Sequence, residues 1–519
     1  MLFRSVMLRH TTTPIGGSGS GRHHGARQRA AIRADLQSPT PAPQEAVINA
    51  PTTSLEQVRA TLRRIDEIDA RHTDTALCSV LAVAPDAEEQ ATVRDHERAT
   101  GHQPGPLHGI PVMVKDNIEA VGLPCTAGSL ALAGHPPTTD APLVARLRAA
   151  GAVIAAATNL SEWANIRSAH SSSGWSAVGG LTKNPWSLDR SAGGSSSGSG
   201  AAVAVGLTRF AVGTETDGSI VCPASLNGVV GIKPTLGSVP ATRVVPISHS
   251  QDVPGPLATT VDDAALLLSV LADQPDLLTR SRAVDVSRLR VGVAEAWLTG
   301  HPATDALFQQ VAARIERFVG SLADAPVPHM PDDIHGDEFT VLMCELVDDL
   351  AAYLEQRGVP GILSLHDVIA FNDSHAEVEL AHFGQDLFHA AAASGGCITD
   401  SYTAARARAL AWAQHECFGP AFAQHDLLVS PVYAPAWKTD FATGHPSAGG
   451  NVTSPAAIAG TPIMSIPMGL VGGLPVGLAI VGPAGAESAM IALARAIEID
   501  LALVSDPAWR PSLSTLDAD

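Results

Sequence analysis

Short apolar runs alternate with helical patterns through the first half of the chain, and this alternation restricts the fold more than any other feature of the sequence. Apolar runs at residues 111–114, 153–157, 210–213 and 229–232 have the length of buried strands. Between the first two, residues 143–150 have helical spacing and end before a glycine. Strands that alternate with helices predict an α/β fold, in which helices pack against a sheet.

Other segments carry similar patterns. Apolar residues recur at helical spacing after Ser54, which is of a type that can cap the start of a helix. Further patterns predict a strand at residues 79–83 and helices at 303–318, 401–423 and 488–499.

The apolar segments of the first and last thirds are alike, and no clean linker separates them. We therefore predict a single large domain over residues 51–506. It has a core at 105–235 and a peripheral helical region at 285–425. Residues 1–50 are rich in Gly, Ser, Pro and Arg, which predicts a disordered leader, and residues 507–519 form a tail.

The composition argues against several classes of protein. With 45% hydrophobic and 16% charged residues, the 519-residue chain can bury a large core. Its formal net charge of −19 argues against nucleic acid as a partner, because phosphate binding needs clustered Lys and Arg. The apolar runs are too short to span a membrane, so we predict a cytoplasmic protein without a membrane partner. No metal is predicted, because HExxH and zinc-spaced Cys/His clusters are absent from the sequence.

The most unusual segment is a Gly/Ser run from Gly193 to Gly200, which leads directly into an apolar run from Ala201 to Leu207. A flexible linker is one interpretation, but the apolar run suits a buried helix and favours a structured loop. Backbone N–H groups at the start of a helix suit an anion. A phosphate loop is disfavoured because GxxxxGK[ST] is absent, and Val203 stands where a dinucleotide loop has its third glycine.

A second glycine-containing turn spans residues 213–220 and places Ser219 directly after Gly218. A serine on an exposed turn has an accessible hydroxyl, and neighbouring N–H groups can point at an oxyanion. The turn lacks the GxSxG pattern of an α/β-hydrolase. Taken alone, Ser219 is either a nucleophile or an ordinary turn serine.

Lys115 follows the apolar run at residues 111–114. A lysine at a strand end ordinarily holds its amine in water, whereas a buried lysine has a lowered pKa and can act as a base. Moving the pKa from about 10.4 to about 7.5 costs roughly 4 kcal/mol. Only a preorganised polar pocket would maintain a lysine in that state.

Together the three segments resemble the amidase signature family. Lys115 lies in a GIPxxxKDN-like strand end, Ser195 is the first serine of a GGSSGGS-like loop, and Ser219 is the serine of a GTDxGGSIRxPA-like turn. The spacing between the two serines fits the family without a gap. The likeness extends over about residues 51–505, with further matches at Asn184-Pro185-Trp186, Gly231-Ile232-Lys233-Pro234-Thr235 and Gly473-Leu474-Pro475-Val476-Gly477.

The resemblance implies a mixed β-sheet core with helices on both faces. It also implies a catalytic triad, in which Lys115 is the base, Ser195 the proton relay and Ser219 the nucleophile that forms an acyl-enzyme. In the family the peptide bond before the relay serine is cis, here Gly194–Ser195. No metal or cofactor is needed, and the region 285–425 is expected to shape the acyl pocket.

The same resemblance assigns an oxyanion hole to four backbone N–H groups, those of Thr216, Asp217, Gly218 and Ser219. Side chains in this turn depart from the commoner pattern. Glu215 and Asp217 replace Asp and Gly, and Val221 replaces a frequent Arg, whereas the backbone donors survive such changes.

Within the family, the resemblance is greatest to bacterial peptide amidases, and the middle segment at residues 364–372 adds to it. We therefore predict hydrolysis of a primary amide, or of a peptide C-terminal amide, to acid and ammonia. Two alternatives stay open. One is the glutaminase subunit of a tRNA-dependent amidotransferase, which needs partner proteins and a glutamine pocket. The other is a catalytically silent scaffold, against which the intact Lys115, Ser195 and Ser219 argue.

Overall fold

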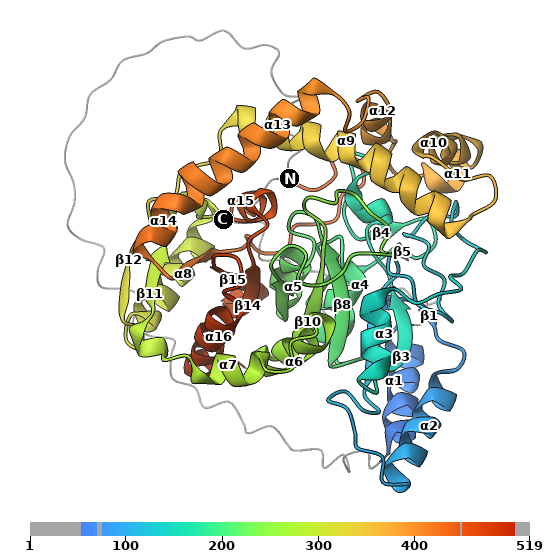
Figure 1. Ribbon diagram of the computed structural model, residues 1–519, viewed down its shortest axis with the longest axis horizontal. Coiled ribbons are helices and arrows are strands. Elements are labelled where there is room, and N and C mark those ends of the chain that lie inside the picture. Colours follow the sequence, from blue (N-terminus) through green and yellow to red (C-terminus); the bar gives the residue numbers. More distant parts are fainter. Residues whose placement is uncertain (1–52, 70–74, 447–448, 504–519) are drawn as a thin grey trace.

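The computed structural model describes residues 53–69, 75–446 and 449–503, so the leader predicted at 1–50 and the tail at 507–519 lie outside the described residues. Within the described part, eleven strands form one sheet (Figure 1). From edge to edge its strands are β1 (Val80–Val83), β3 (Val153–Thr158), β2 (Pro111–Lys115), β8 (Phe210–Glu215), β10 (Val253–Ala258), β9 (Val230–Lys233), β14 (Ile463–Val471), β15 (Leu474–Val481), β13 (Leu427–Pro431), β11 (Arg290–Val293) and β12 (Ser321–Asp324).

The sheet is mixed, as the resemblance implied. Strands β3, β2 and β8 are parallel, and so are β13, β11 and β12, while the central strands pair antiparallel. Strands from the first half and from the last third of the chain meet where β9 pairs with β14. Two small ribbons stand apart, β4 (Trp175–Ser176) with β5 (Gly180–Leu181) and β6 (Lys183–Asn184) with β7 (Ser187–Ser191).

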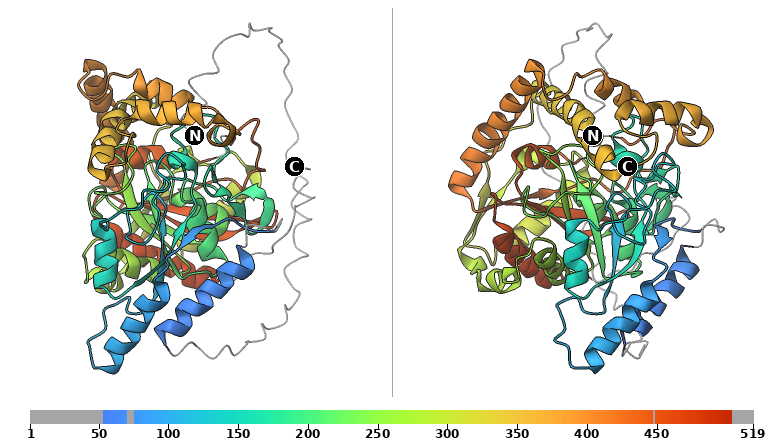
Figure 2. Two further views of the ribbon diagram at one scale, coloured as in Figure 1. Left: turned by 90° about the vertical axis from the view of Figure 1, so that its right-hand side faces the viewer. Right: turned by 45° about the vertical axis from the view of Figure 1, so that its right-hand side comes forward.

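Helices cover both faces of the sheet, which confirms the predicted fold class (Figure 2). Side chains of a strand alternate between faces, so Val112 and Val114 join one core cluster and Met113 joins another. The first face packs against α1 (Ser54–Ile68), α2 (Ala87–Ala99), α3 (Pro142–Ala149), α6 (Val261–Leu271), α7 (Leu277–Ala283), α8 (Pro302–Ile315) and α16 (Glu487–Leu501). The second face packs against α4 (Ser197–Ala204), α5 (Val221–Asn227), α14 (Gly419–Gln424) and α15 (Thr453–Ala459).

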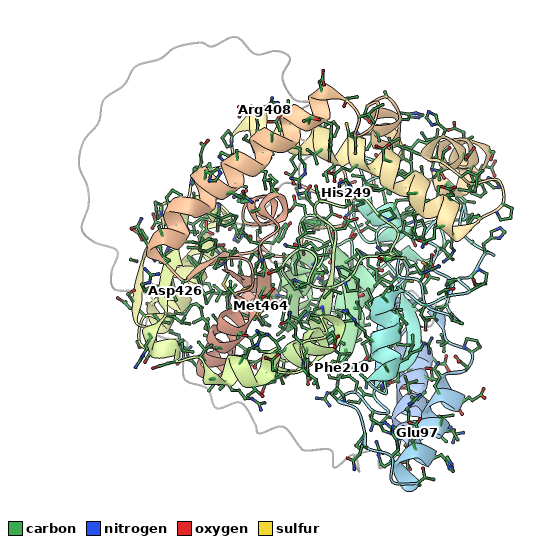
Figure 3. The ribbon with its side chains drawn as sticks, viewed as in Figure 1. Glu97, Phe210, His249, Arg408, Asp426 and Met464 are labelled. Atoms are coloured by element: carbon green, nitrogen blue, oxygen red, sulfur yellow. The ribbon has the colours of Figure 1, made fainter. Side chains whose placement is uncertain are left out.

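The region 285–425 is mostly helical, but it also supplies β11 and β12 to the sheet, which the helical prediction missed. Helices α9 (Asp332–Arg357) and α13 (Asp400–Ala411) pack against each other across one end of the molecule (Figure 1). Arg408 on α13 lies at the outer rim, whereas Phe210 and Met464 lie inside, on the sheet (Figure 3). The shorter helices of this region are α10 (Leu365–Ser374), α11 (Ala376–Glu379) and α12 (Asp386–Ala392).

Two boundaries differ from the predictions. Helix α1 is capped by Thr53, whose side chain accepts from the Glu56 N–H in a capping box, while Ser54 is the first helical residue. The helix predicted at 401–423 is broken by a π-helical segment, Trp412–Phe418, before α14. Pro420, the second residue of α14, has no N–H to donate to the preceding turn, which accounts for the break.

Candidate active site

Lys115 is fully buried at the carboxyl end of β2. Its Nζ donates to Ser195 Oγ at 2.7 Å and to Thr214 Oγ1 at 2.8 Å, and Asn117 Nδ2 also donates to Thr214 Oγ1. Burial lowers the pKa of Lys115 to about 7, although the negative charges of Asp252 and Glu215 act against that effect. An amine in this state is partly neutral at pH 7 and can accept a proton from the Ser195 hydroxyl.

The Gly/Ser run forms a tight loop that opens into α4, and the peptide bond between Gly194 and Ser195 is cis, as the resemblance implied. Several of the loop's N–H groups are used inside the protein. That of Ser196 donates to the Ser219 carbonyl at 3.1 Å, and that of Gly198 donates to the Asn159 carbonyl at 3.0 Å. These bonds and the burial of the loop disfavour both the linker and the phosphate-loop interpretations.

Ser219 lies in the turn between β8 and α5, and 8% of its surface is exposed. Glu215 holds this turn, because its Oε2 accepts from the N–H groups of Ile220 at 2.7 Å and Val221 at 2.9 Å at the start of α5. The longer Glu side chain thus fixes the turn at a position where Asp is commoner. Gly218 has a φ of 79°, and an added Cβ would lie 2.9 Å from Tyr433 Oη, so this position requires glycine.

The four backbone N–H groups predicted as oxyanion donors belong to this turn. In the part of the chain that the structure describes, the N–H groups of Thr216, Asp217, Gly218 and Ser219 form no hydrogen bond to a protein acceptor. Donors left free beside a pocket can bind an oxyanion.

An open pocket lies over the turn. Ser219 lines it, while the completely buried Ser195 and Lys115 lie beneath the surface. Several walls come from segments that carry no motif, namely Ile247, Leu342, Tyr433, Trp437 and His445. The other lining residues are Ala164, Asn165, Ile166, Ser168, Ala169, Ser171, Ser173, Gly194, Thr216, Asp217 and Cys222.

Charge in this pocket is sparse and acidic. Among the described residues that line it, Asp217 is the one carboxylate, and Lys and Arg are absent. The nearby Arg167 is fully buried, and its guanidinium pairs with Glu162 at 3.2 Å. The pocket therefore offers a neutral group more favourable surroundings than it offers a carboxylate.

A sequence model of the amidase family matches residues 56–491. The chain belongs to the amidase family. Amide hydrolysis is thus its class of reaction, and a buried lysine beneath two serines is consistent with it. Among the described residues, no helix combines the length and the apolar character needed to cross a membrane.

Members of the amidase family with different names resemble the chain over most of its length. A glutamyl-tRNA(Gln) amidotransferase subunit of Anaeromyxobacter sp. (strain K) is 35% identical over 480 residues, which cover 88% of this chain and 94% of that protein. A probable amidase of Arabidopsis thaliana is 36% identical over 376 residues, 68% of this chain and 73% of that protein.

Among solved structures, the native peptide amidase from Stenotrophomonas maltophilia superposes with a TM-score of 0.82 at 40% identity, over 88% of this chain and 95% of that chain. A peptide amidase in complex with the competitive inhibitor chymostatin gives a TM-score of 0.84 at 41% identity, over 88% and 96% of the two chains.

Proposed function

We propose that this amidase hydrolyses a primary carboxylic acid amide, with a peptide C-terminal amide as substrate, to the free acid and ammonia. The observation that carries the proposal is the buried Lys115, whose Nζ lies 2.7 Å from Ser195 Oγ beneath the pocket that Ser219 lines. Identity of 40–41% to peptide amidases supports this choice of substrate.

In the proposed mechanism, Ser219 Oγ attacks the amide carbonyl carbon. Its proton passes to Ser195 Oγ, and the proton of Ser195 passes to the neutral Nζ of Lys115. The carbonyl oxygen becomes an oxyanion, which the free N–H groups of residues 216–219 stabilise.

Collapse of this intermediate breaks the carbon–nitrogen bond, and the relay returns a proton to the departing nitrogen, which leaves as ammonia. Ser219 is then esterified. A water molecule attacks the ester carbonyl, gives its proton to the same relay and releases the acid, so that the three side chains return to their starting protonation states.

The pocket also bears on the glutaminase alternative, which the 35% identity to the amidotransferase subunit raises. In free glutamine, a carboxylate lies only a few bonds away from the side-chain amide. A pocket lined by Asp217 and without Lys or Arg among its described lining residues disfavours that carboxylate. A peptide whose C-terminus is an amide has no such charge, which supports the peptide-amide substrate.

The test measures ammonia release from an N-protected dipeptide amide and from free glutamine by the purified chain. We expect release from the dipeptide amide and a loss of at least ~10³-fold in kcat for Ser219→Ala, because the nucleophile is removed. Ser374→Ala is the matched control, since that serine is exposed at the end of α10.

Release from glutamine alone would favour the glutaminase function. A folded protein that releases ammonia from neither substrate nor from simple primary amides would contradict the proposal and favour the scaffold.

A further inference from the structure

A loop between the sheet and helix α9 lies beside the oxyanion turn, and we name its residues 247–252 the strap. The strap ends at Asp252, directly before β10. The Asp252 carboxylate accepts from Thr216 Oγ1 at 2.6 Å, from the Ile247 N–H at 2.8 Å and from the Ser248 N–H at 3.0 Å. One side chain thus connects the turn that carries Ser219 to both ends of the strap.

We propose that Asp252 is a positioning residue of the amide-hydrolysing site, which holds the oxyanion turn through Thr216 and places a negative charge near Lys115. Thr216 is the first residue of the turn, and its own N–H is one of the four oxyanion donors. Fixing its side chain therefore fixes the direction in which that donor points. The proposal rests on the roles proposed above for Lys115 and Ser219.

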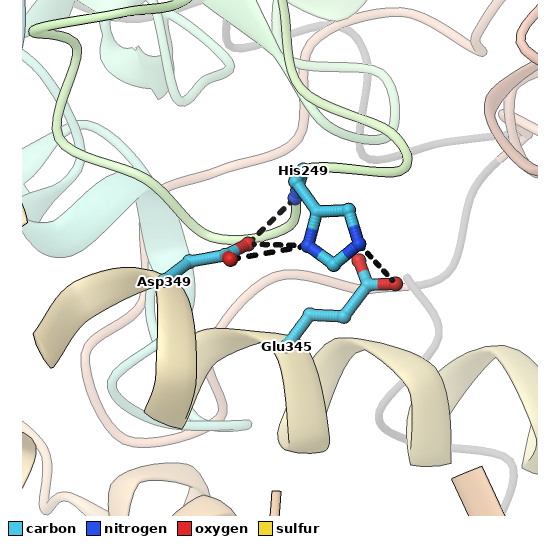
Figure 4. A group of neighbouring side chains, drawn as sticks. All are labelled: His249, Glu345 and Asp349. Atoms are coloured by element: carbon cyan, nitrogen blue, oxygen red, sulfur yellow. Dashed lines mark hydrogen bonds and ion pairs between the residues drawn. The ribbon is translucent and has the colours of Figure 1, made fainter. Parts of the chain in front are cut away.

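Helix α9 holds the strap from the other side. The Ser248 hydroxyl and the Ser250 N–H both donate to the buried Glu345. The N–H of His249 donates to Asp349 Oδ2 at 2.7 Å, and its ring Nδ1 lies 3.0 Å from the same oxygen (Figure 4). Two carboxylates one helical turn apart therefore fix the middle of the strap.

A third carboxylate extends this contact. Gln251 Nε2 donates to Glu338 Oε1 at 2.8 Å. Positions 338, 345 and 349 recur at helical spacing, so the three acids share one face of α9. Because each of the three acids accepts a hydrogen bond from the strap, the cluster serves as an anchor. Leu342 lies on the same helix and lines the pocket, so α9 contacts the substrate site as well as the strap.

The negative charge of Asp252 also acts on the base. Asp252 and Glu215 are the carboxylates that raise the pKa of Lys115 against the effect of burial. Asp116 follows Lys115 in sequence, but its carboxylate accepts from the Thr126 N–H at 2.9 Å. Removing the charge of Asp252 therefore lowers the pKa of Lys115 further and leaves more of the lysine neutral at low pH.

Asp252 itself is ionised above about pH 6. Burial raises its pKa to about 6, while hydrogen bonds from Thr216, Ile247 and Ser248 lower it and the charge of Asp349 on α9 raises it. Above that pH the carboxylate is an anion that accepts all three hydrogen bonds.

The experiment compares pH profiles of primary-amide hydrolysis for three variants, from about pH 5 to about pH 9. We expect Asp252→Asn to lower kcat ~tenfold or more and to move the acid limb of kcat/KM toward lower pH by roughly one unit. Thr216→Val removes the hydrogen bond to Asp252 without a change of charge. We therefore expect kcat to fall while the acid limb of kcat/KM stays at the same pH. Thr216→Ser keeps the hydroxyl and is expected to restore kcat.

Asp263→Asn is the matched control, because it removes a carboxylate that pairs with Arg209 beyond the opposite end of β8. An inactive wild-type protein contradicts the proposed function. An active wild type whose Asp252→Asn and Thr216→Val variants keep both kcat and profile overturns the positioning role alone. If Asp252→Asn fails to fold by circular dichroism, Thr216→Val decides: unchanged kcat overturns the proposal, and a loss that Thr216→Ser restores supports it.

Discussion

Burial changes the protonation of Lys115 relative to that of a lysine in water. A lysine in water is protonated at pH 7 and cannot accept a proton. The side chain of Lys115 is surrounded by protein on all sides, and its pKa falls to about 7. The hydroxyls of Ser195 and Thr214 replace the lost water and hold the amine in place.

We therefore expect kcat/KM to rise about tenfold per pH unit below pH 7 and to level off above it, because the neutral amine is the active form. A guanidinium stays charged at all these pH values, so Lys115→Arg should lose activity by at least ~10³-fold at every pH. Initial rates at low substrate concentration across the pH range test both. A wild-type profile without an acid limb would contradict Lys115 as the base.

The three residues proposed to carry the chemistry could be found from sequence because each lies in a dense local motif. The individual wall residues could not, since Ile247, Tyr433 and Trp437 lie in segments without a motif, and Leu342 could be placed only within the region 285–425 that was expected to shape the pocket. Their common feature is proximity to Ser219, which tertiary structure alone creates. Asp252 was missed for the same reason, because nothing in its local sequence indicates that it reaches Thr216.

At the scale of elements, the Gly/Ser run is fixed by close packing. An added Cβ on Gly198 would lie 2.2 Å from the Ser79 carbonyl oxygen and 2.6 Å from the backbone of Asn159. Helix α4 therefore begins in contact with the end of β3, which brings Ser195 to Lys115.

Gly198→Ala should lower the free energy of unfolding by about 1–3 kcal/mol and reduce kcat, because α4 must move away from Asn159. Gly336→Ala is the control. It lies in helix α9 with open space around it, so the same change should stabilise by ~0.5–1 kcal/mol. Chemical denaturation measures both. A Gly198→Ala protein as stable as the wild type would show that the contact is not tight.

Periodicity predicted the long buried elements well and the short exposed ones poorly. Strands β2, β3 and β8 are buried along their whole length and appear in sequence as apolar runs. Strand β12 has no buried residue, so its sequence carries no apolar signal. Its place in the sheet comes from parallel pairing with β11, which a local pattern does not encode.

For the whole molecule, buried acids make stability depend on pH. Burial raises the pKa values of Asp116 and Asp252 from 3.8 to about 6. Between these values the folded state binds more protons than the unfolded state, so stability falls as pH rises through this window. Acids whose pKa is lowered, such as Asp426, lose their contribution only below their unfolded pKa of 3.8.

We therefore expect the protein to become more stable when the pH is lowered from about 7 to about 5, by ~1 kcal/mol for each of the two carboxyls. Chemical denaturation at a series of pH values measures this change. Asp116→Asn should make the dependence shallower, because one titrating carboxyl is gone. Stability that falls steadily from pH 7 to pH 5 would contradict the buried, high-pKa state of these acids.

The class of fold could be predicted from alternating patterns, but the arrangement of the sheet could not. Apolar runs indicate strands without indicating their neighbours, and here β9 pairs with β14 across more than two hundred residues of chain. The mixed character of the sheet was implied by family resemblance and confirmed by the structure.

The attachment of the middle segment has a consequence for how such an enzyme can evolve. Residues 332–424 leave after β12 and return at β13, while the hydrogen bonds of Lys115 all lie within residues 115–214. Evolution can therefore replace this segment, including the pocket residue Leu342, without changing the hydrogen bonds of Lys115. A transplanted segment must still present acids at positions 338, 345 and 349, so recombination between relatives is open only to donors that keep them.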